Sequence, residues 1–132
     1  NECVIWSLVI CLPSESSPAI LIGVSHGTLT LTLPSAFNGS APISDFVTKS
    51  TFANINDLNF GLKKNGEWVQ QGNTSLMLYH FDFIVSYISQ FITLKTGDLI
   101  FTGTPKGVGK VEIGDRLEGF IEDQPFFDFE VK

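Results

Sequence analysis

The Asn65-Gly66 dipeptide constrains the fold of this chain more than any other local feature. It separates residues 57–63 from residues 67–71, two short segments that suit β-strands. Asn-Gly favours the type I′ turn, whose twist matches the twist of two antiparallel strands. We therefore predict a β-hairpin over residues 57–71, and we expect the rest of the fold to be rich in strands.

Further strands and loops are predicted on both sides of this hairpin. Residues 3–12 form an apolar run that suits a buried strand, and residues 28–33 alternate with the period of a half-buried strand. Serine, proline and glycine indicate two loops, over residues 13–18 and 38–43. The remaining strands are expected at residues 19–24, 116–122 and 126–131, with a turn at Ile113-Gly114-Asp115 before the second of them.

One helix is predicted over residues 80–91, because apolar residues recur there at helical spacing. Asp82 is positioned to cap its first turn. Six or more strands with one packed helix indicate an α+β fold, and 132 residues fit a single domain, residues 1–132. The apolar positions of the helix are Phe81, Ile84, Val85, Ile88, Phe91 and Ile92.

Residues 97–109 are the strongest candidate for a binding site. Gly97-Asp98 predicts a turn, residues 99–101 a buried strand, and a glycine-rich loop follows. Glycine permits positive φ and a close approach of the main chain, so the loop can direct backbone N–H groups at an anion. Thr102 and Thr104 add hydroxyl donors beside it. The alternative is an ordinary tight turn between two strands.

Charge and motif spacing exclude two classes of phosphate binding. A P-loop is excluded because counting back from Gly109-Lys110 puts Thr104 where its first glycine belongs and Val111 where its serine or threonine belongs. The 14 acidic and 8 basic side chains give a net charge of −6, and the basic residues form no cluster. Nucleic acid is therefore not an expected partner.

The two cysteines and the first apolar run indicate neither a disulfide framework nor a membrane span. Cys3 and Cys11 are expected to be reduced, buried thiols, because no histidine or cysteine accompanies them at the spacing of a zinc site. The apolar run lacks the basic leader of a signal peptide, and about ten residues are too few to span a bilayer, which takes about 20. No membrane partner is expected, and a cytoplasmic location is predicted.

The beginning of the chain differs in composition from the rest. Only Glu2 and Glu15 are charged in the first 44 residues, against twenty charged residues from Asp45 onward. The chain does not begin with methionine, and we expect it to have been trimmed or to be part of something longer. Residues 1–35 are accordingly treated as an atypical amino-terminal segment.

Three ordered blocks carry a resemblance to a known family. They are residues 57–77, 84–90 and 93–109, of which the last reads Thr-Leu-Lys-Thr-Gly-Asp-Leu-Ile-Phe-Thr-Gly-Thr-Pro-Lys-Gly-Val-Gly. They resemble the carboxy-terminal half of the fumarylacetoacetate hydrolase family, and the match extends over residues 36–132. The resemblance implies a mixed-sheet β-roll that is rich in strands and has one main helix, and it implies a homodimer.

The resemblance also implies an enzyme that depends on Mg²⁺ or Mn²⁺ and acts on small 2-oxo or 1,3-diketo acids. The reactions are C–C bond hydrolysis, acylpyruvate cleavage, oxaloacetate decarboxylation or a related isomerisation, in which the ion stabilises the enolate formed as the C–C bond breaks. Carried over to this chain, the substrate-binding residues are Thr102, Gly103 and Thr104. Thr104 is expected to contact the substrate carboxylate; the alternative is that it only orders its own turn.

The metal ligands that the resemblance implies are missing from this sequence. Aligning the first apolar strand with the family's Glu-x-Glu strand puts Cys3 and Ile5 on the glutamate positions. Ser25 falls where an aspartate is expected, and Ser35 where a lysine is expected. Glu2 is a weak candidate metal ligand if the register slips. Because Mg²⁺ requires several anionic oxygen ligands, the chain is expected to bind metal poorly.

Two classes of function are left open, and the catalytic residues are unknown. The first is a truncated and weakly active hydrolase or decarboxylase of the family. The second is a catalytically silent, β-rich binding or dimerisation module. An unrelated small-ligand β-barrel is a third possibility that rests only on the number of strands. Ordinary packed, surface or turn roles are expected for His26, His80, Asp98, Asp115 and Arg116.

Overall fold

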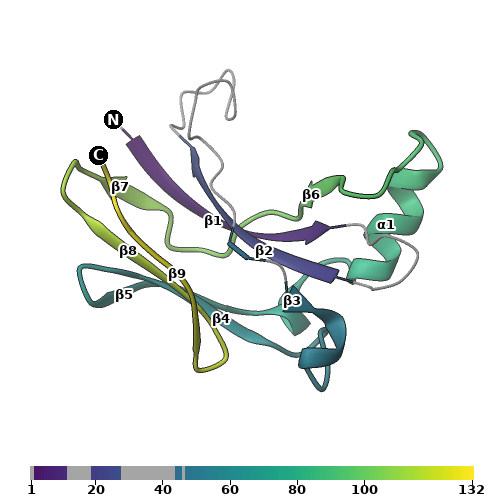
Figure 1. Ribbon diagram of the computed structural model, residues 1–132, viewed down its shortest axis with the longest axis horizontal. Helices are drawn as coiled ribbons and strands as arrows, with labels where there is room; N and C mark the ends of the chain where they lie inside the picture. The colour runs from purple at the N-terminus through teal and green to yellow at the C-terminus, as the bar shows by residue number, and fades with distance from the viewer. Residues whose placement is uncertain (1, 12–18, 28–43, 46) are drawn as a thin grey trace.

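The computed structural model describes residues 2–11, 19–27, 44–45 and 47–132, and for residues 2–11 and 19–27 it describes the course of the backbone. These residues form nine strands, one α-helix and two short 3-10 helices, which confirms the α+β class (Figure 1). The elements are β1 (Glu2–Cys11), β2 (Ala19–Gly27), β3 (Val47–Thr48), η1 (Lys49–Thr51), β4 (Asn59–Lys64), β5 (Glu67–Asn73), η2 (Thr74–Leu76), α1 (Phe81–Ser89), β6 (Leu99–Phe101), β7 (Gly109–Val111), β8 (Arg116–Ile121) and β9 (Gln124–Glu130).

The first sheet is built on β1. The β2 strand pairs with it in antiparallel fashion along one edge, and β3 pairs with β2. Two strands share the other edge: β6 pairs with the end of β1, where Ile10 faces Ile100, and β7 pairs with its beginning, where Cys3 faces Lys110. The chain between β6 and β7 therefore leaves the sheet, and this segment is the glycine-rich loop.

The second sheet contains the predicted hairpin. The φ angles of 52° at Asn65 and 85° at Gly66 are both positive, as a type I′ turn requires. The hairpin strands β4 and β5 continue the order β5-β4-β8-β9, all antiparallel. The described strands thus form two separate sheets and not the one closed sheet of a small-ligand β-barrel.

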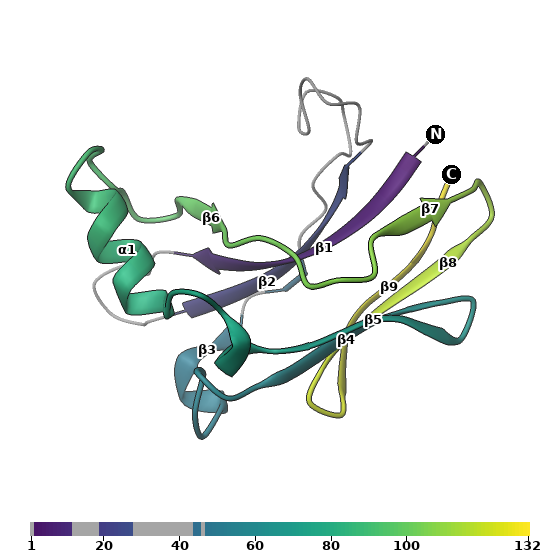
Figure 2. The ribbon, with the colours of Figure 1, turned by 180° about the vertical axis from the view of Figure 1, so that it is seen from behind.

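The hydrophobic core lies between the two sheets, which form two layers with α1 at one end beside β6 (Figures 1 and 2). Leu62, Leu117 and Ile121 of β4 and β8 are 0% exposed. Val111 of β7 and Phe81 of α1 belong to the same buried cluster. Burial of one such side chain contributes about 1.5–3 kcal/mol, so this cluster fixes β7 and α1 against the second sheet.

The helix begins one residue later than predicted and is not capped by Asp82. His80 is the N-cap residue, and its side chain makes no capping hydrogen bond. Asp82 lies inside the first turn, where its negative charge still favours the helix dipole. Because α1 ends at Ser89, Phe91 does not continue the packed face and is 70% exposed.

Residues 99–101 form the predicted strand, β6, but the prediction that it is buried is wrong. Leu99 is 36% exposed and Phe101 is 43% exposed, while Ile100 packs against the core. Alternate side chains of a strand point to opposite faces, and β6 is an edge strand of its sheet. Only the middle residue therefore faces the interior.

Several predictions fall outside the described residues. They are the loops at residues 13–18 and 38–43 and the strand at residues 28–33. The side chains of Cys3, Cys11 and His26 also lie outside the description, although their backbone belongs to β1 and β2. In the part of the chain that the structure describes, no helix is long and apolar enough to cross a bilayer.

Candidate functional site

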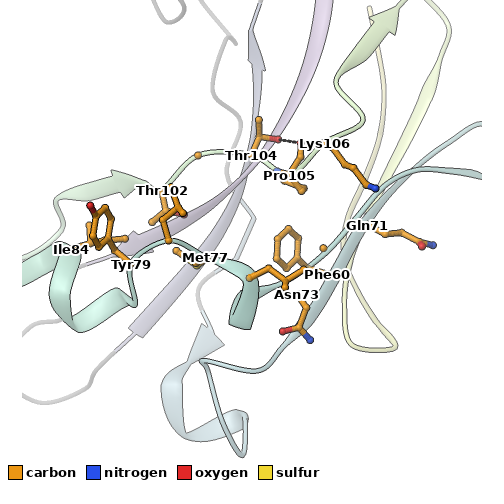
Figure 3. A pocket seen from close by; sticks show the side chains of 14 residues that line it. Phe60, Gln71, Asn73, Met77, Tyr79, Ile84, Thr102, Thr104, Pro105 and Lys106 are labelled. Atoms are coloured by element: carbon orange, nitrogen blue, oxygen red, sulfur yellow. Dashed lines mark hydrogen bonds between the residues drawn. The ribbon is translucent and has the colours of Figure 1, made fainter.

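A cavity of about 480 Å³ lies beside the glycine-rich loop. This volume is in the range of about 300–1,000 Å³ that small-molecule sites occupy. Figure 3 shows the loop on one side of the cavity, with the end of β5 and the segment before α1 on the other. The lining residues are Phe60, Gln71, Gly72, Asn73, Leu76, Met77, Leu78, Tyr79, Ile84, Thr102, Gly103, Thr104, Pro105 and Lys106.

The loop reaches the cavity because it is longer than the gap it bridges. It joins β6, which ends at Phe101 opposite Val9, to β7, which begins at Gly109 opposite Val4. Residues 102–108 thus run past only residues 5–8 of β1. The surplus length makes the loop bulge away from the sheet, and it carries all three predicted binding residues into the cavity wall.

Two glycines give the loop its course. Gly103 has a φ of 104° with no atom within 4 Å of a built Cβ, so its backbone angle, and not lack of space, requires glycine. Gly107 has a φ of 106°, and a Cβ there would lie 2.4 Å from the carbonyl oxygen of Val69 on β5. The expected positive φ is confirmed, and the close approach at Gly107 is to β5 of the protein itself.

Gln70 of β5 holds the loop from inside the protein. Its side chain is 2% exposed, and its amide nitrogen donates to Thr104 Oγ1 at 3.1 Å and to the carbonyl oxygen of Pro105 at 3.2 Å. Sequence reasoning missed this residue. From the sequence, a polar side chain between the strand residues Val69 and Gln71 is expected to face solvent. Its hydrogen bonds to the loop become evident only in the structure, where the loop lies against β5.

The hydroxyl of Thr104 keeps its proton available. Its oxygen accepts the hydrogen bond from Gln70, so the hydroxyl must donate elsewhere. Within the loop it reaches only the adjacent carbonyl of Pro105, at 3.4 Å, which is a long hydrogen bond. Thr104 is therefore oriented by the protein and still able to donate to a molecule in the cavity.

The charge of the cavity suits an anion. Among the described lining residues, Lys106 is the one side chain with a formal charge, and none is a carboxylate. Thr102, Gly103 and Thr104 of the same loop also line the cavity. A carboxylate in the cavity would meet an ammonium group and hydroxyl donors without facing a negative group, an arrangement that favours charge-assisted hydrogen bonds.

The opposite wall is mostly apolar, with Gln71 and Asn73 as polar members, and it is held by the second sheet. The ring of Phe60 lies over Gly72, its cross-strand neighbour, and a Cβ at Gly72 would come within 2.8 Å of that ring. The hydroxyl of Thr74, 1% exposed, donates to Ile55 O and accepts from Leu58 N, both at 2.8 Å. These contacts tie the turn after β5 to the segment before β4, and this turn leads into the residues that line the cavity.

The positions aligned with metal ligands come together in the fold, but their residues do not suit a divalent ion. Ile5 of β1 lies directly opposite Ser25 of β2, beside the part of β1 that the loop runs past. Glu2 lies further along β1, opposite Val111 of β7. Among the described residues there is no group of three or more His, Cys, Asp or Glu side chains that could hold a metal.

The charged turn residues have structural roles away from the cavity. Asp115 accepts from the backbone N–H of Glu112 at 2.8 Å, from the Asn65 amide at 2.7 Å and from Lys64 Nζ at 3.1 Å. These three donors, in that order of importance, lower the pKa of Asp115 below its ordinary value. Asp98 similarly accepts from the backbone N–H of Lys95 at 2.7 Å, so both predicted turn roles are confirmed.

Arg116 is the surface ion-pair partner that the sequence predicted. Its guanidinium binds both carboxylate oxygens of Asp128 on β9, with Nε 2.7 Å from Oδ1. The hydrogen bonds and the charge of Asp128 raise the pKa of Arg116, and those of Arg116 lower the pKa of Asp128. Neither residue lines the cavity. His80, likewise, is an exposed residue at the start of α1.

Most of the chain matches known proteins in sequence. A family model described as fumarylacetoacetate (FAA) hydrolase C-terminal matches residues 24–131. Over 104 residues the chain is 44% identical to the mitochondrial oxaloacetate tautomerase of Mus musculus, a match that covers 79% of this chain and 47% of that protein. The corresponding protein of Oryza sativa subsp. japonica is 41% identical, with coverage of 79% and 45%. The chain thus spans about half the length of the curated relatives it matches.

Solved structures share the fold. Fumarylpyruvate hydrolase from Pseudomonas aeruginosa, solved with Mn²⁺ and pyruvate, matches with a TM-score of 0.83 and 26% sequence identity. The match covers 99% of this chain and 66% of the hydrolase chain. A fumarylacetoacetate hydrolase family protein from yeast has a TM-score of 0.75 and 25% identity, with coverage of 100% and 65%. These matches confirm the β-roll fold class, and the bound Mn²⁺ agrees with the ion expected for proteins of this kind.

Proposed function

Because the chain belongs to the fumarylacetoacetate hydrolase family, we propose that its cavity binds the carboxylate of a small 2-oxo or 1,3-diketo acid. The carboxylate lies against the loop, where Thr102, Gly103 and Thr104 supply donors and Lys106 supplies the opposite charge. The observation that carries this proposal is a cavity of suitable size whose described lining has one cation and no anion.

The keto acid fits the rest of the cavity as well. Most side chains of the wall facing the loop are apolar, among them Phe60, Met77 and Ile84. A small acid whose carboxylate binds Thr104 would place its carbon chain against this wall. Burial of such apolar surface adds to binding at about 25 cal/mol per Å².

The proposed activity is weak C–C bond hydrolysis or decarboxylation. In the family this chemistry depends on a divalent ion, and Cys3, Ile5 and Ser25 supply none of the anionic oxygens that such an ion requires. We therefore propose that the chain by itself binds the acid and turns it over slowly unless further ligands reach the site. The alternative is a catalytically silent binding module that keeps the same cavity.

An assay for product separates these two functions. Pyruvate release from acylpyruvates and decarboxylation of oxaloacetate are measured with 5 mM Mn²⁺, roughly the millimolar range that metal stabilisation requires, and with a chelator. Thr104→Val is compared with Thr51→Val, which removes an exposed hydroxyl in η1, outside the cavity. Turnover that needs Thr104 and is unchanged in Thr51→Val supports the enzyme, and binding without turnover supports the silent module.

The affinity of the acid is expected to fall in Thr104→Val. The loss of one charge-assisted hydrogen bond is worth about 1.5–3 kcal/mol, or roughly 10- to 100-fold in Kd. Equal pyruvate affinities of Thr104→Val and the unaltered chain would contradict the proposed site.

The cytoplasmic location of the protein stays a prediction. The names of the curated relatives favour a mitochondrial location instead.

A further inference from the structure

A second cavity, of about 290 Å³, lies between the second sheet and β7. Its described lining comes from β4, β5, β7 and β8 and from Gly107 of the loop. Figures 1 and 2 show β7 at the end of the molecule away from α1, whereas the first cavity reaches the segment before α1. Because no described residue lines both cavities, the second is a separate space, and the proposed function does not use it.

The floor of the second cavity is the hydrophobic core. Leu62, Leu117 and Val111 line it and are 0%, 0% and 3% exposed. Water finds few hydrogen-bond partners among such side chains, and atoms that face an unfilled space lack van der Waals partners. An apolar group that enters the second cavity therefore gains contacts with the core.

Glycine leaves this space unfilled. Gly109 lies two residues before Val111 in β7, so side chains at the two positions point to the same, buried side of the strand. Among the described residues, the atom nearest to a built Cβ at Gly109 is 3.9 Å away. Gly107 adds no side chain either, because its Cβ would lie 2.4 Å from the carbonyl oxygen of Val69. A larger residue at Gly109 would put its side chain into the cavity.

The mouth of the second cavity is positively charged. It opens beside Gly109 and Lys110, which are exposed, and no carboxylate is among the described residues that line it. Lys64, the other cation of the lining, pairs with Asp115 at 3.1 Å and donates to the Lys110 carbonyl oxygen at 3.1 Å. Lys110 Nζ lies 3.8 Å from a Glu112 carboxylate oxygen, and these side chains are 59% and 76% exposed, so this ion pair is weak. Lys110 is therefore able to pair with another carboxylate.

We propose that the second cavity binds a monocarboxylate whose alkyl tail enters the core and whose carboxylate pairs with Lys110. The volume sets the length of the tail. One water takes about 30 Å³ of the liquid, so a cavity of about 290 Å³ holds roughly ten non-hydrogen atoms. Octanoate is an acid of this size. Its tail lies against Leu62 and Leu117, and its carboxylate lies at the mouth.

Isothermal titration calorimetry with octanoate tests whether the alkyl tail enters the cavity. Gly109→Val puts a valine side chain into this space, and Thr51→Val is the control, because it places valine in η1, outside both cavities. Each methylene that is excluded costs about fourfold in Kd. We therefore expect Gly109→Val to weaken octanoate binding at least tenfold and Thr51→Val to leave it unchanged.

Gly109→Ala gives a second reading if Gly109→Val does not fold. Its methyl group should weaken octanoate binding about fourfold. Hexanoate, which is two methylenes shorter, should bind the unaltered protein roughly 15-fold more weakly than octanoate. Equal affinities of the unaltered protein and the Gly109 variants overturn the proposal. So does an absence of binding at about 10 mM octanoate, roughly tenfold above a millimolar Kd.

A lysine variant tests where the carboxylate lies. Lys110→Met removes the charge at the mouth and keeps an apolar side chain of similar length. Lys95→Met makes the same change at an exposed residue that lines neither cavity. Octanoate should bind Lys110→Met about three- to fivefold more weakly, because the lost ion pair is partly exposed, and should bind Lys95→Met as before. Equal octanoate affinities in the two variants contradict the pairing with Lys110.

Thr104→Val distinguishes the second cavity from the first. It removes a donor from the wall of the first cavity only. Octanoate should bind Thr104→Val and the unaltered protein equally, and saturating pyruvate should not displace it. Loss of octanoate binding in Thr104→Val, or its displacement by pyruvate, overturns the second site. Octanoate binding that persists when pyruvate fails to bind supports the second site and counts against the proposed function alone.

Discussion

Replacement of Gln70 by methionine removes the two hydrogen bonds from its side-chain amide to the glycine-rich loop and leaves the volume of the side chain nearly unchanged. The amide donates to Thr104 Oγ1 and to Pro105 O, at 3.1 and 3.2 Å. Each hydrogen bond contributes about 0.5–1.5 kcal/mol net, so the two together contribute about 1–3 kcal/mol. Thr104 is exposed and can bond to water instead, which favours the lower half of this range.

We therefore expect Gln70→Met to lower the free energy of unfolding by about 1–2 kcal/mol. For a chain of this length that corresponds to a fall in Tm of about 4–8 °C. Urea denaturation at pH 7 and thermal unfolding measure the two quantities. Gln71→Met is the matched control, because Gln71 is an exposed neighbour and no hydrogen bond among the described residues joins it to the loop. Its stability should change by less than about 0.5 kcal/mol.

The same variant tests the role of Gln70 in binding. Without the amide, the Thr104 hydroxyl must be ordered when the acid binds, at a cost of about 0.5–1.5 kcal/mol. Pyruvate affinity, measured by isothermal titration calorimetry, should fall roughly 2- to 10-fold. If stability and affinity are the same in Gln70→Met and the unaltered chain, this buried amide does not orient the loop.

Two further changes test other parts of the structure. Gly119→Ala puts a Cβ 1.7 Å from the ring of Phe127, its cross-strand neighbour on β9. In urea denaturation this variant should lose about 1–3 kcal/mol of stability. Gly109→Ala is the control, because its Cβ would have its nearest contact at 3.9 Å, and its stability should not change. Because the folded-state pKa of Asp115 lies below its unfolded value, its carboxylate stabilises the fold above about pH 4, and this stabilisation is lost as the pH falls through the folded-state pKa. Asp115→Asn should therefore flatten the acid limb of a Tm-against-pH profile; an unchanged acid limb would rule out this role.

Sequence reasoning located the loop and the hairpin because both depend on local chemistry. Asn65-Gly66 fixes its turn through backbone angles, and the glycines of the loop do the same. The residues that require tertiary contacts were not found. Gln70 is recognisable only once the loop lies against β5, and Lys106 only once the cavity is formed.

The errors have the same origin. The prediction of a buried strand at residues 99–101 used hydrophobicity alone, and hydrophobicity cannot say that β6 is the edge of its sheet. The helical pattern was read as one packed face, although Tyr79, Phe83 and Tyr87, spaced four residues apart, form a second, exposed face. Apolar periodicity shows which residues lie together, but not whether anything covers them.

A pyruvate titration of the ¹⁵N-labelled chain, followed by amide chemical shifts in the presence of a metal chelator, tests whether the loop binds the carboxylate. We expect the amide signals of residues 102–104 and 106 to move together, to saturate, and to respond much less in Thr104→Val. Binding at the loop is contradicted if pyruvate leaves these signals unmoved, or if the saturable shifts lie instead around the β8–β9 hairpin.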